Sequence, residues 1–173
     1  ERYNGSGATV RGFNVEGRAA FTRWFELQAG VTLQQSRYKE PEFWSEDAEV
    51  PPVRRMFRTP DTYGYFTASF KPVRNFTADL SGTCTGSMLV QHMAGSGVAQ
   101  DVAVSTPSFF DMNIRLSYDV RIYKEITMQL YGGVQNLFNA YQKDFDKGVD
   151  RDSGYIYGPS LPRSWFVGAK FSF

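Results

Sequence analysis

The amino-acid sequence predicts an all-β protein and, more narrowly, an antiparallel up-and-down transmembrane β-barrel. Three observations carry this prediction. Apolar residues recur at every second position in several segments, short and long connections alternate strictly between those segments, and the last segment ends on a terminal phenylalanine. Period-two alternation is typical of a strand with one apolar face, and tight turns gathered at one end of a sheet are typical of outer-membrane barrels.

Seven strands are expected, each with apolar residues on one face. The first four cover residues 9–21, 26–38, 62–70 and 76–86, with apolar positions at Phe13, Val15, Ala19 and Phe21, at Leu27, Ala29, Val31 and Leu33, at Phe66, Ala68 and Phe70, and at Phe76, Ala78, Leu80 and Cys84. Polar residues occupy most of the alternate positions, which a strand sorts onto its opposite face.

The fifth expected strand, residues 109–120, alternates most regularly, with apolar residues at Phe110, Met112, Ile114, Leu116, Tyr118 and Val120. The last two strands cover residues 126–136 and 163–173, with apolar positions at Ile126, Met128, Leu130 and Val134, and at Trp165, Val167, Ala169, Phe171 and Phe173. Most of the seven are close to the roughly 9–11 residues that cross a bilayer when tilted.

The connections between these strands fall into two classes. Three are short, at residues 22–25, 71–75 and 121–125, and three are long, at residues 39–61, 87–108 and 137–162. Their alternation places every short turn at one end of the meander, assigned here to the periplasm, and every long loop at the other, assigned to the cell exterior. Aromatic residues near the short turns are expected to form a membrane-interface girdle: Phe21, Trp24, Phe25, Phe70, Phe76, Tyr118, Tyr123, Phe171 and Phe173.

Composition narrows the function classes. The formal net charge of +1 gives no support for nucleic-acid binding. No apolar run approaches the roughly 20 residues of a membrane-spanning helix. The only histidine, His92, lies in a long loop without a nearby Asp–Ser arrangement, so we expect neither an enzyme nor a cofactor.

An odd number of strands is unusual for a bacterial single-chain barrel, and an open sheet leaves backbone groups unpaired in hydrocarbon. We therefore interpret the whole of residues 1–173 as the C-terminal portion of a larger barrel. Two alternatives stay open. One is a small eight-stranded structural or passive barrel, for which residues 1–8 offer only a short, glycine-rich extra segment. The other is a soluble β-sandwich binding module.

Motifs in the last forty residues add a resemblance. Val134-Gln-Asn-Leu-Phe-Asn139 is followed by Tyr141, then by Gly158-Pro159 and Pro162-Arg163, and then by the terminal strand. Together with "RTPDTYGYFTASF" and "TGSM" earlier in the chain, this order resembles the closing part of TonB-dependent outer-membrane receptors. Within that family the sequence most resembles receptors of Bacteroidetes type, of the siderophore or cobalamin kind.

The resemblance implies a bacterial outer-membrane active importer with a 22-stranded barrel plugged by an N-terminal domain. It implies a scarce ligand, a ferric siderophore, haem or cobalamin, and import driven by the TonB complex. The implied partners are outer-membrane lipid, the TonB complex through a region outside this sequence, the barrel assembly machinery and, as a further candidate, a surface lipoprotein. The assembly signal would comprise Trp165, Phe171 and Phe173.

The long loops hold the ligand-binding candidates, which are Trp44, Arg54, Arg55, Arg58, His92 and Tyr141. Guanidinium groups suit carboxylates or phosphates and aromatic rings suit flat macrocycles, so the first loop fits an anionic ferric chelate or a corrinoid. The alternative is a loop that folds on its own Glu–Arg pairs.

A weak calcium site is a further candidate in the last long loop, with oxygen ligands from Asp144, Asp146, Asp150 and Asp152. The spacing does not match an EF-hand, and lysines and an arginine lie between the acidic residues. A solvated loop with internal salt bridges is the alternative.

Overall fold

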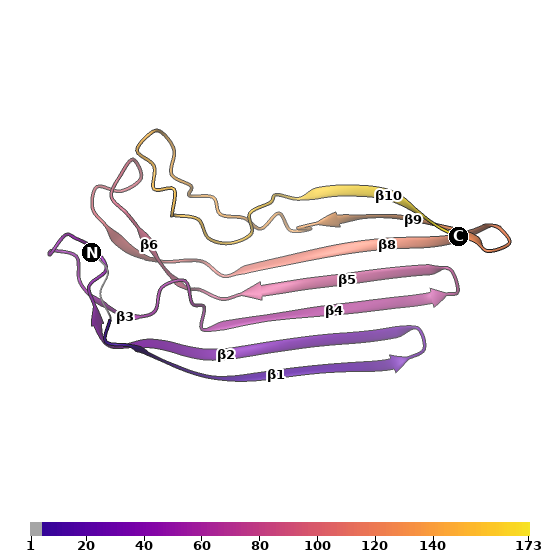
Figure 1. Ribbon diagram of the computed structural model, residues 1–173, viewed down its shortest axis with the longest axis horizontal. Helices are drawn as coiled ribbons and strands as arrows, with labels where there is room; N and C mark the ends of the chain where they lie inside the picture. The colour runs from indigo at the N-terminus through magenta and orange to yellow at the C-terminus, as the bar shows by residue number, and fades with distance from the viewer. Residues whose placement is uncertain (1–4) are drawn as a thin grey trace.

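The computed structural model describes residues 5–173, and seven long strands form one antiparallel meander in them (Figure 1). The strand order in the sheet is β1-β2-β4-β5-β8-β9-β10. The strands are β1 (Ala8–Thr22), β2 (Phe25–Glu42), β4 (Thr62–Val73), β5 (Phe76–Thr85), β8 (Phe109–Tyr123), β9 (Ile126–Gln135) and β10 (Ser164–Ser172). All seven expected strands are confirmed, and β1, β2, β4 and β8 are longer than the alternation predicted.

The connections are segregated as the sequence predicted. Figure 1 shows the tight turns β1–β2, β4–β5 and β8–β9 at one end, next to the C-terminus, and the long connections at the other end. The three hairpins leave only two residues between their strands, at positions 23–24, 74–75 and 124–125. Lys124 takes a positive φ of 42° in the last of them. The segregation follows from the meander, because each antiparallel strand reverses the direction of the one before it.

Three short strands within the long connections were not predicted. They are β3 (Val53–Arg55), which pairs with β2, and β6 (Leu89–His92) and β7 (Val102–Ser105), which pair with each other as a separate hairpin. An isolated bridge joins Phe57 to Leu89. These pairings satisfy backbone groups within the loops, which the sequence had left as irregular connections.

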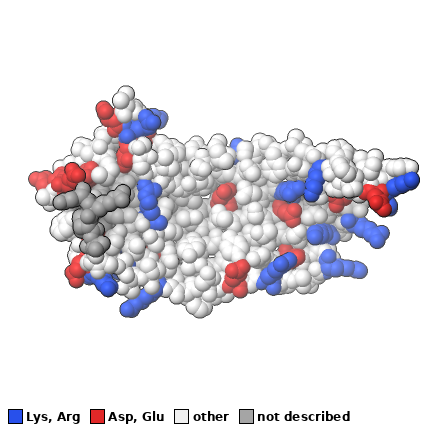
Figure 2. Space-filling view, viewed as in Figure 1, with Lys and Arg blue, Asp and Glu red and all other residues white. Residues whose placement is uncertain are grey.

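The two faces of the sheet have different chemistry. On the apolar face Leu33, Phe110, Leu116 and Val167 are at least two-fifths exposed, and no second layer formed by residues 5–173 packs on them. The opposite, polar face carries hydrogen-bonded side chains, among them Ser69 with Asp79, Arg115 with Gln129, and Gln129 with Asp119. Figure 2 shows acidic and basic side chains scattered over the strands of the viewed face.

Residues 5–173 by themselves do not form a β-sandwich. A sandwich buries the apolar face of one sheet against a second sheet about 10 Å away. The only other sheet in residues 5–173 is the two-stranded β6–β7 hairpin. Residues 5–173 contain no helix of the length and apolar character needed to cross a membrane.

Glycines paired with aromatic rings join neighbouring strands. The ring of Phe166 covers Gly133, the ring of Tyr131 covers Gly168, and the ring of Tyr65 covers Gly30. Phe166 and Tyr131 also pack on each other, with ring centroids 6.4 Å apart. These contacts account for Phe166, the one large apolar residue that breaks the alternation of β10: it lies on the polar face because a glycine opposite leaves room for its ring.

Candidate functional site

The three long connections fold together at the end of the sheet opposite the tight turns (Figure 1). We call this structure the loop layer; it comprises residues 43–61, 86–108 and 136–163. The buried hydrophobic cluster of residues 5–173 lies in this layer and at the adjoining first residue of β8. It contains Val90, Phe109, Tyr155 and Tyr157, each less than a tenth exposed. A sheet with one unpacked face has no interior of its own, so the buried core forms where the connections fold over each other.

Gln142 fixes the backbone of the last loop around this core. Its side chain is 1% exposed, donates to the carbonyl oxygen of Tyr155 at 3.1 Å and accepts from the amide of Tyr157 at 2.8 Å. Both bonds are made inside the cluster, where an unpaired amide costs about 1–3 kcal/mol. They hold the two tyrosines in the core.

His92 and Asp146 link the second loop to the third. His92 Nε2 lies 3.0 Å from each carboxylate oxygen of Asp146, and its ring stacks on Tyr155 with centroids 3.7 Å apart. The hydrogen bond to His92 is the main cause of a lowered pKa for Asp146, to which the backbone amide of Asp152 also donates. His92 is 6% exposed, so its imidazole faces the protein interior and not a ligand.

Asp144 accepts hydrogen bonds from two tyrosine hydroxyls, Tyr155 at 2.8 Å and Tyr157 at 2.6 Å. Burial raises the pKa of Asp144, but the hydroxyls of Tyr157 and Tyr155 outweigh it and leave the pKa below its ordinary value. Burial, with the nearby carboxylate, raises the pKa of both tyrosines. The two hydroxyls therefore stay protonated donors at every physiological pH.

Acid is expected to loosen the loop layer. A carboxylate with a lowered folded-state pKa stabilises the fold above its unfolded pKa of about 3.9, and this stability is lost as the pH falls through the folded value. The pKa values of Asp144 and Asp146 are both lowered in the folded protein. We expect unchanged protection of residues 137–163 from pH 7 to about 5 and a steep loss below about 4. Hydrogen–deuterium exchange, corrected for its intrinsic pH dependence, measures this. A loss of protection already complete at pH 5 would contradict it.

Two of the predicted ligand-binding arginines hold loops together. The guanidinium of Arg55 pairs with Asp61 at 3.0 Å and donates to the carbonyl oxygen of Ser87 at 2.7 Å. Arg58 has a positive φ of 56° and donates to the carbonyl oxygens of Gly154 and Ile156. Arg55 thus pairs with an aspartate of its own loop and bonds to the second loop, while Arg58 bonds to the third.

Three other predicted residues remain accessible. Trp44 is half-buried, packing on Phe57 with ring centroids 5.3 Å apart. Arg54 is exposed and only weakly paired, at 4.0 Å from Glu40. Tyr141 is 37% exposed and lines a cavity of about 560 Å³, with Phe138 and Lys143 among its other walls. The structure therefore leaves Trp44, Arg54 and Tyr141 as the loop-layer candidates for contact with a ligand.

The four aspartates of the last loop are not gathered into one cluster of side chains. Within residues 5–173 no three His, Cys, Asp or Glu side chains lie together in a group that could hold a metal ion. The reason is that their oxygens already have partners: Asp144 binds two tyrosines, Asp146 binds His92, and Asp152 accepts from the backbone amides of Met93 and Gly154. The structure thus gives the calcium prediction no support.

The asparagines of the NLFN motif fix the base of the last loop. Asn136 is 3% exposed; its side chain donates to the carbonyl oxygens of Ala140 and Leu161 and accepts from the amide of Ala140. Asn139 accepts from the amide of Arg163, where the terminal strand begins. Both have positive φ, 49° and 53°, a region that asparagine enters more readily than most residues. The two asparagines of the motif therefore have a structural role, because they hold the base of the last loop in place.

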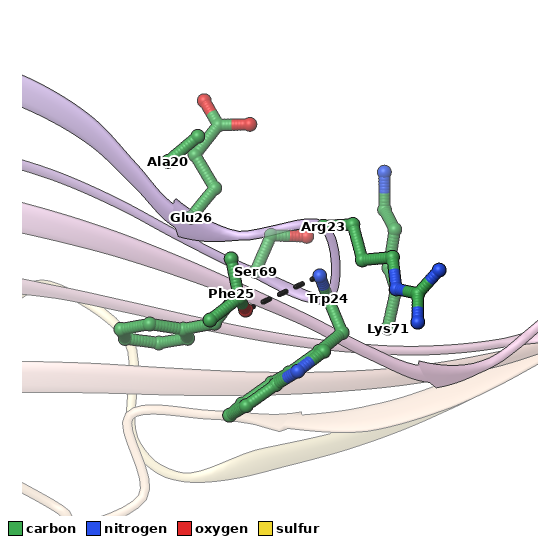
Figure 3. Close-up of a pocket in the computed structure, with 8 residues that line it drawn as sticks. Ala20, Arg23, Trp24, Phe25, Glu26, Ser69 and Lys71 are labelled. Carbon is green, nitrogen blue, oxygen red and sulfur yellow. Dashed lines mark hydrogen bonds between the residues drawn. The ribbon is translucent and has the colours of Figure 1, made fainter.

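Two further cavities lie outside the loop-layer candidates. One, of about 420 Å³, opens beside the polar face between Asp111, Gln135 and the segment 158–162, and a buried oxygen of Asp111 in it has no hydrogen-bond partner. The other, of about 180 Å³, lies at the β1–β2 turn (Figure 3). Figure 3 shows Glu26 and Lys71 on one side of the ribbon and Trp24 on the other.

Two residues of the predicted assembly signal, Trp165 and Phe171, lie on the apolar face of β10 at the edge of the sheet and are 76% and 56% exposed. The third, Phe173, follows the strand and is 98% exposed. Four of the aromatic residues near the tight turns contact one another: Phe21 and Phe25 stack at 5.7 Å, and Trp24 meets Phe70 edge-on at 5.2 Å.

Several residues that organise the loop layer escaped the sequence analysis, notably Gln142, Tyr155 and Tyr157, and Asp101, which accepts from Ser45 and from the amide of Ala94. Hydrogen bonds from Ser45, and then from Ala94, lower the pKa of Asp101. The only available signal was the density of tyrosines and carboxylates in residues 141–157, a pattern that fits either a weak calcium site or a solvated loop.

Comparison with known proteins gives matches among solved structures only. No protein-family model and no curated protein matches the sequence. The chain is similar to the ferric-catecholate import receptor Fiu from Escherichia coli K12, with 20% identity and a TM-score of 0.65, and to the siderophore receptor PiuA from Acinetobacter baumannii, with 17% identity and a TM-score of 0.63. Each match covers 94% of this chain. The chain spans 20% and 21% of the two receptor chains, so it shares the fold of one part of each.

Proposed function

We propose that this chain is the C-terminal part of the β-barrel of a TonB-dependent outer-membrane importer of ferric siderophores. The observation that carries the proposal is the meander itself, with tight turns at one end and an ordered loop layer at the other, matched over 94% of the chain by two siderophore receptors. We assign the whole of residues 1–173 to this barrel part; residues 1–4 lie outside the described structure.

The exposure of the apolar face supports a location in the outer membrane. A soluble protein rarely leaves so large an apolar surface in water, whereas a barrel presents that surface to lipid. The seven long strands of the sheet have 9 to 18 residues, and about 9–11 suffice to span a tilted barrel wall. The free Cys84 is exposed on the same face.

The open edges of the sheet support a larger barrel. β1 pairs only with β2, and β10 pairs only with β9, which leaves the outer backbone groups of both strands without partners among residues 5–173. Hydrocarbon does not tolerate such edges, so further strands of the same barrel would close it. The plug domain, the TonB contact and the assembly machinery belong to this proposal. This chain spans only 20% and 21% of the two receptor chains, which favours a larger barrel over a small eight-stranded one.

The ligand class rests on the two structural neighbours, whose descriptions name a ferric-catecholate import receptor and a siderophore receptor. Neither description supports a cobalamin receptor or a likeness to receptors of Bacteroidetes. A ferric catecholate is anionic and aromatic, which suits a cation and aromatic rings. We assign contacts to Arg54, Trp44 and Tyr141, the accessible candidates of the loop layer.

Iron uptake tests this function. Cells starved of iron are given a radioactive ferric catecholate, and uptake is compared between the parent strain, a strain lacking the gene and a strain lacking TonB. Deletion of the gene and deletion of TonB are each expected to abolish the ferric-catecholate uptake that this protein provides. Arg54→Ala and Tyr141→Ala are each expected to weaken binding by about 5- to 30-fold, since each removes roughly 1–2 kcal/mol of contact. The control Arg74→Ala, at the tight-turn end, should bind normally.

Normal ferric-catecholate uptake without the gene would overturn the ligand assignment. The same strains then test haem and cobalamin as alternative ligands. Absence of the protein from purified outer membranes, or gel mobility that does not change on heating, would overturn the transporter itself.

A further inference from the structure

We propose that the tight-turn end of the sheet is a docking surface for the anionic phospholipid headgroups of the membrane leaflet next to it. This inference rests on the proposed function, because it requires that the strands cross a membrane. The surface is called the turn rim and consists of Arg23, Lys71, Arg74, Arg121 and Lys124.

The turn rim has an unbalanced charge. The three tight connections, residues 22–25, 71–75 and 121–125, contain these five basic residues and one acidic residue, Glu125. The long loops have the opposite balance, since acidic residues outnumber basic ones there. All five basic residues of the rim are exposed, and blue side chains project at this end of the molecule in Figure 2. The tight-turn end of the sheet is therefore net basic, and the long-loop end is net acidic.

The cations of the rim are available to an external partner. The ion pairs among residues 5–173 join Arg18 to Glu26, Arg54 to Glu40, Arg55 to Asp61 and His92 to Asp146, and none includes a rim residue. Arg121 is the member with a structural bond, donating to the carbonyl oxygen of Lys124 at 2.7 Å. An unpaired cation at a turn gains most from an anion that approaches from outside the protein.

Aromatic residues place the rim at the depth of the headgroups. Trp24 is 44% exposed and packs edge-on against Phe70, while Phe21 stacks on Phe25, all on the apolar face directly beside the turns. Tyr123 is 60% exposed, and the ammonium of Lys124 lies 5.1 Å from its ring centroid. Tryptophan and tyrosine prefer the interface between hydrocarbon and headgroups. The neighbouring cations therefore lie at the level of the lipid phosphates.

The physical reason for preferring anionic lipids is the number of cations. Each Lys or Arg near an anionic membrane surface adds a favourable interaction that salt screens. A zwitterionic headgroup offers a phosphate but also brings an ammonium group that repels the rim. The cavity of Figure 3, lined by Arg23 and Lys71, does not enclose the phosphate, since Glu26 also lines it and is paired with Arg18. The surface thus binds a layer of headgroups and not one buried anion.

Lipid retention tests the proposal. The full-length protein is reconstituted in nanodiscs of phosphatidylethanolamine and phosphatidylglycerol in a fixed ratio and extracted in mild detergent. The lipids that remain bound are then counted by native mass spectrometry. The wild type is expected to retain a several-fold excess of phosphatidylglycerol over the bulk ratio, which falls as salt is raised. The variant Arg23→Gln/Lys71→Gln/Arg74→Gln/Lys124→Gln should retain the bulk ratio.

A matched control removes four charges from the other end, by Lys39→Gln/Lys143→Gln/Lys147→Gln/Arg151→Gln, and should keep the excess. An unchanged excess in the turn-rim variant would overturn the proposal, as would an equal loss in the control. Heat-modifiable mobility, measured on every sample, separates the two hypotheses. A folded, membrane-inserted wild type without a lipid preference overturns this inference alone, whereas a wild type that does not insert overturns the transporter as well.

Discussion

Replacing Gly133 with alanine is expected to destabilise the sheet by about 3 kcal/mol, the upper end of the range for overpacking. A methyl group at this position would overlap the carbonyl oxygen of Ile114 on β8 and the ring of Phe166 on β10. The ring can rotate away, but the carbonyl belongs to the β8–β9 ladder and cannot move without separating the strands. Urea unfolding of the full-length protein in micelles, followed by heat-modifiable mobility, measures the loss.

Two other glycines make a graded control series for this prediction. Gly132→Ala, one residue earlier on β9, places its methyl group 3.2 Å from the carbonyl oxygen of Phe166 and should cost less than Gly133→Ala. Gly17→Ala on β1 meets no atom within 4 Å and should be neutral or slightly stabilising. Equal unfolding midpoints for all three variants would contradict the assigned packing.

Replacing Asn136 with alanine is the second substitution with a large expected effect. It removes three side-chain hydrogen bonds and leaves the backbone groups of Ala140 and the carbonyl oxygen of Leu161 unpaired. It also puts alanine at a φ of 49°, which asparagine tolerates better. With about 1–3 kcal/mol for each of these three groups left unsatisfied, the total is expected to be at least about 3 kcal/mol.

The effect should be local to the loop layer at first. Hydrogen–deuterium exchange is expected to accelerate in residues 136–163, while exchange in β1 and β2 stays unchanged. The control is Asn75→Ala at the β4–β5 turn, where the backbone carbonyl oxygen accepts from Asp119 and is kept by alanine. Wild-type exchange in the Asn136→Ala protein would show that the NLFN motif does not hold the loop.

The alternation of apolar residues was sufficient to predict the sheet. Ile114, Leu116 and Tyr118 share a face in the structure because successive strand residues must point to opposite sides, whatever the rest of the chain does. The lengths of the connections then placed the turns and loops, since an antiparallel meander has no other way to arrange them. Phe166 is the instructive exception, because its place on the polar face depends on a glycine of the neighbouring strand.

Only the tertiary structure decided the roles of the loop residues. His92, Asp144 and Asp146 looked like surface or metal-binding groups, yet Asp144 accepts hydrogen bonds from the buried Tyr155 and Tyr157. His92 binds Asp146, which is more than 50 residues away along the chain. Arg55 and Arg58 bind carbonyl oxygens of other loops. A strand pattern is local and repeats every two residues, so the sequence by itself determined the strands, their faces and the segregation of the turns. Loop contacts depend on which distant groups meet, and no local pattern records that, so the loop layer became visible only in three dimensions.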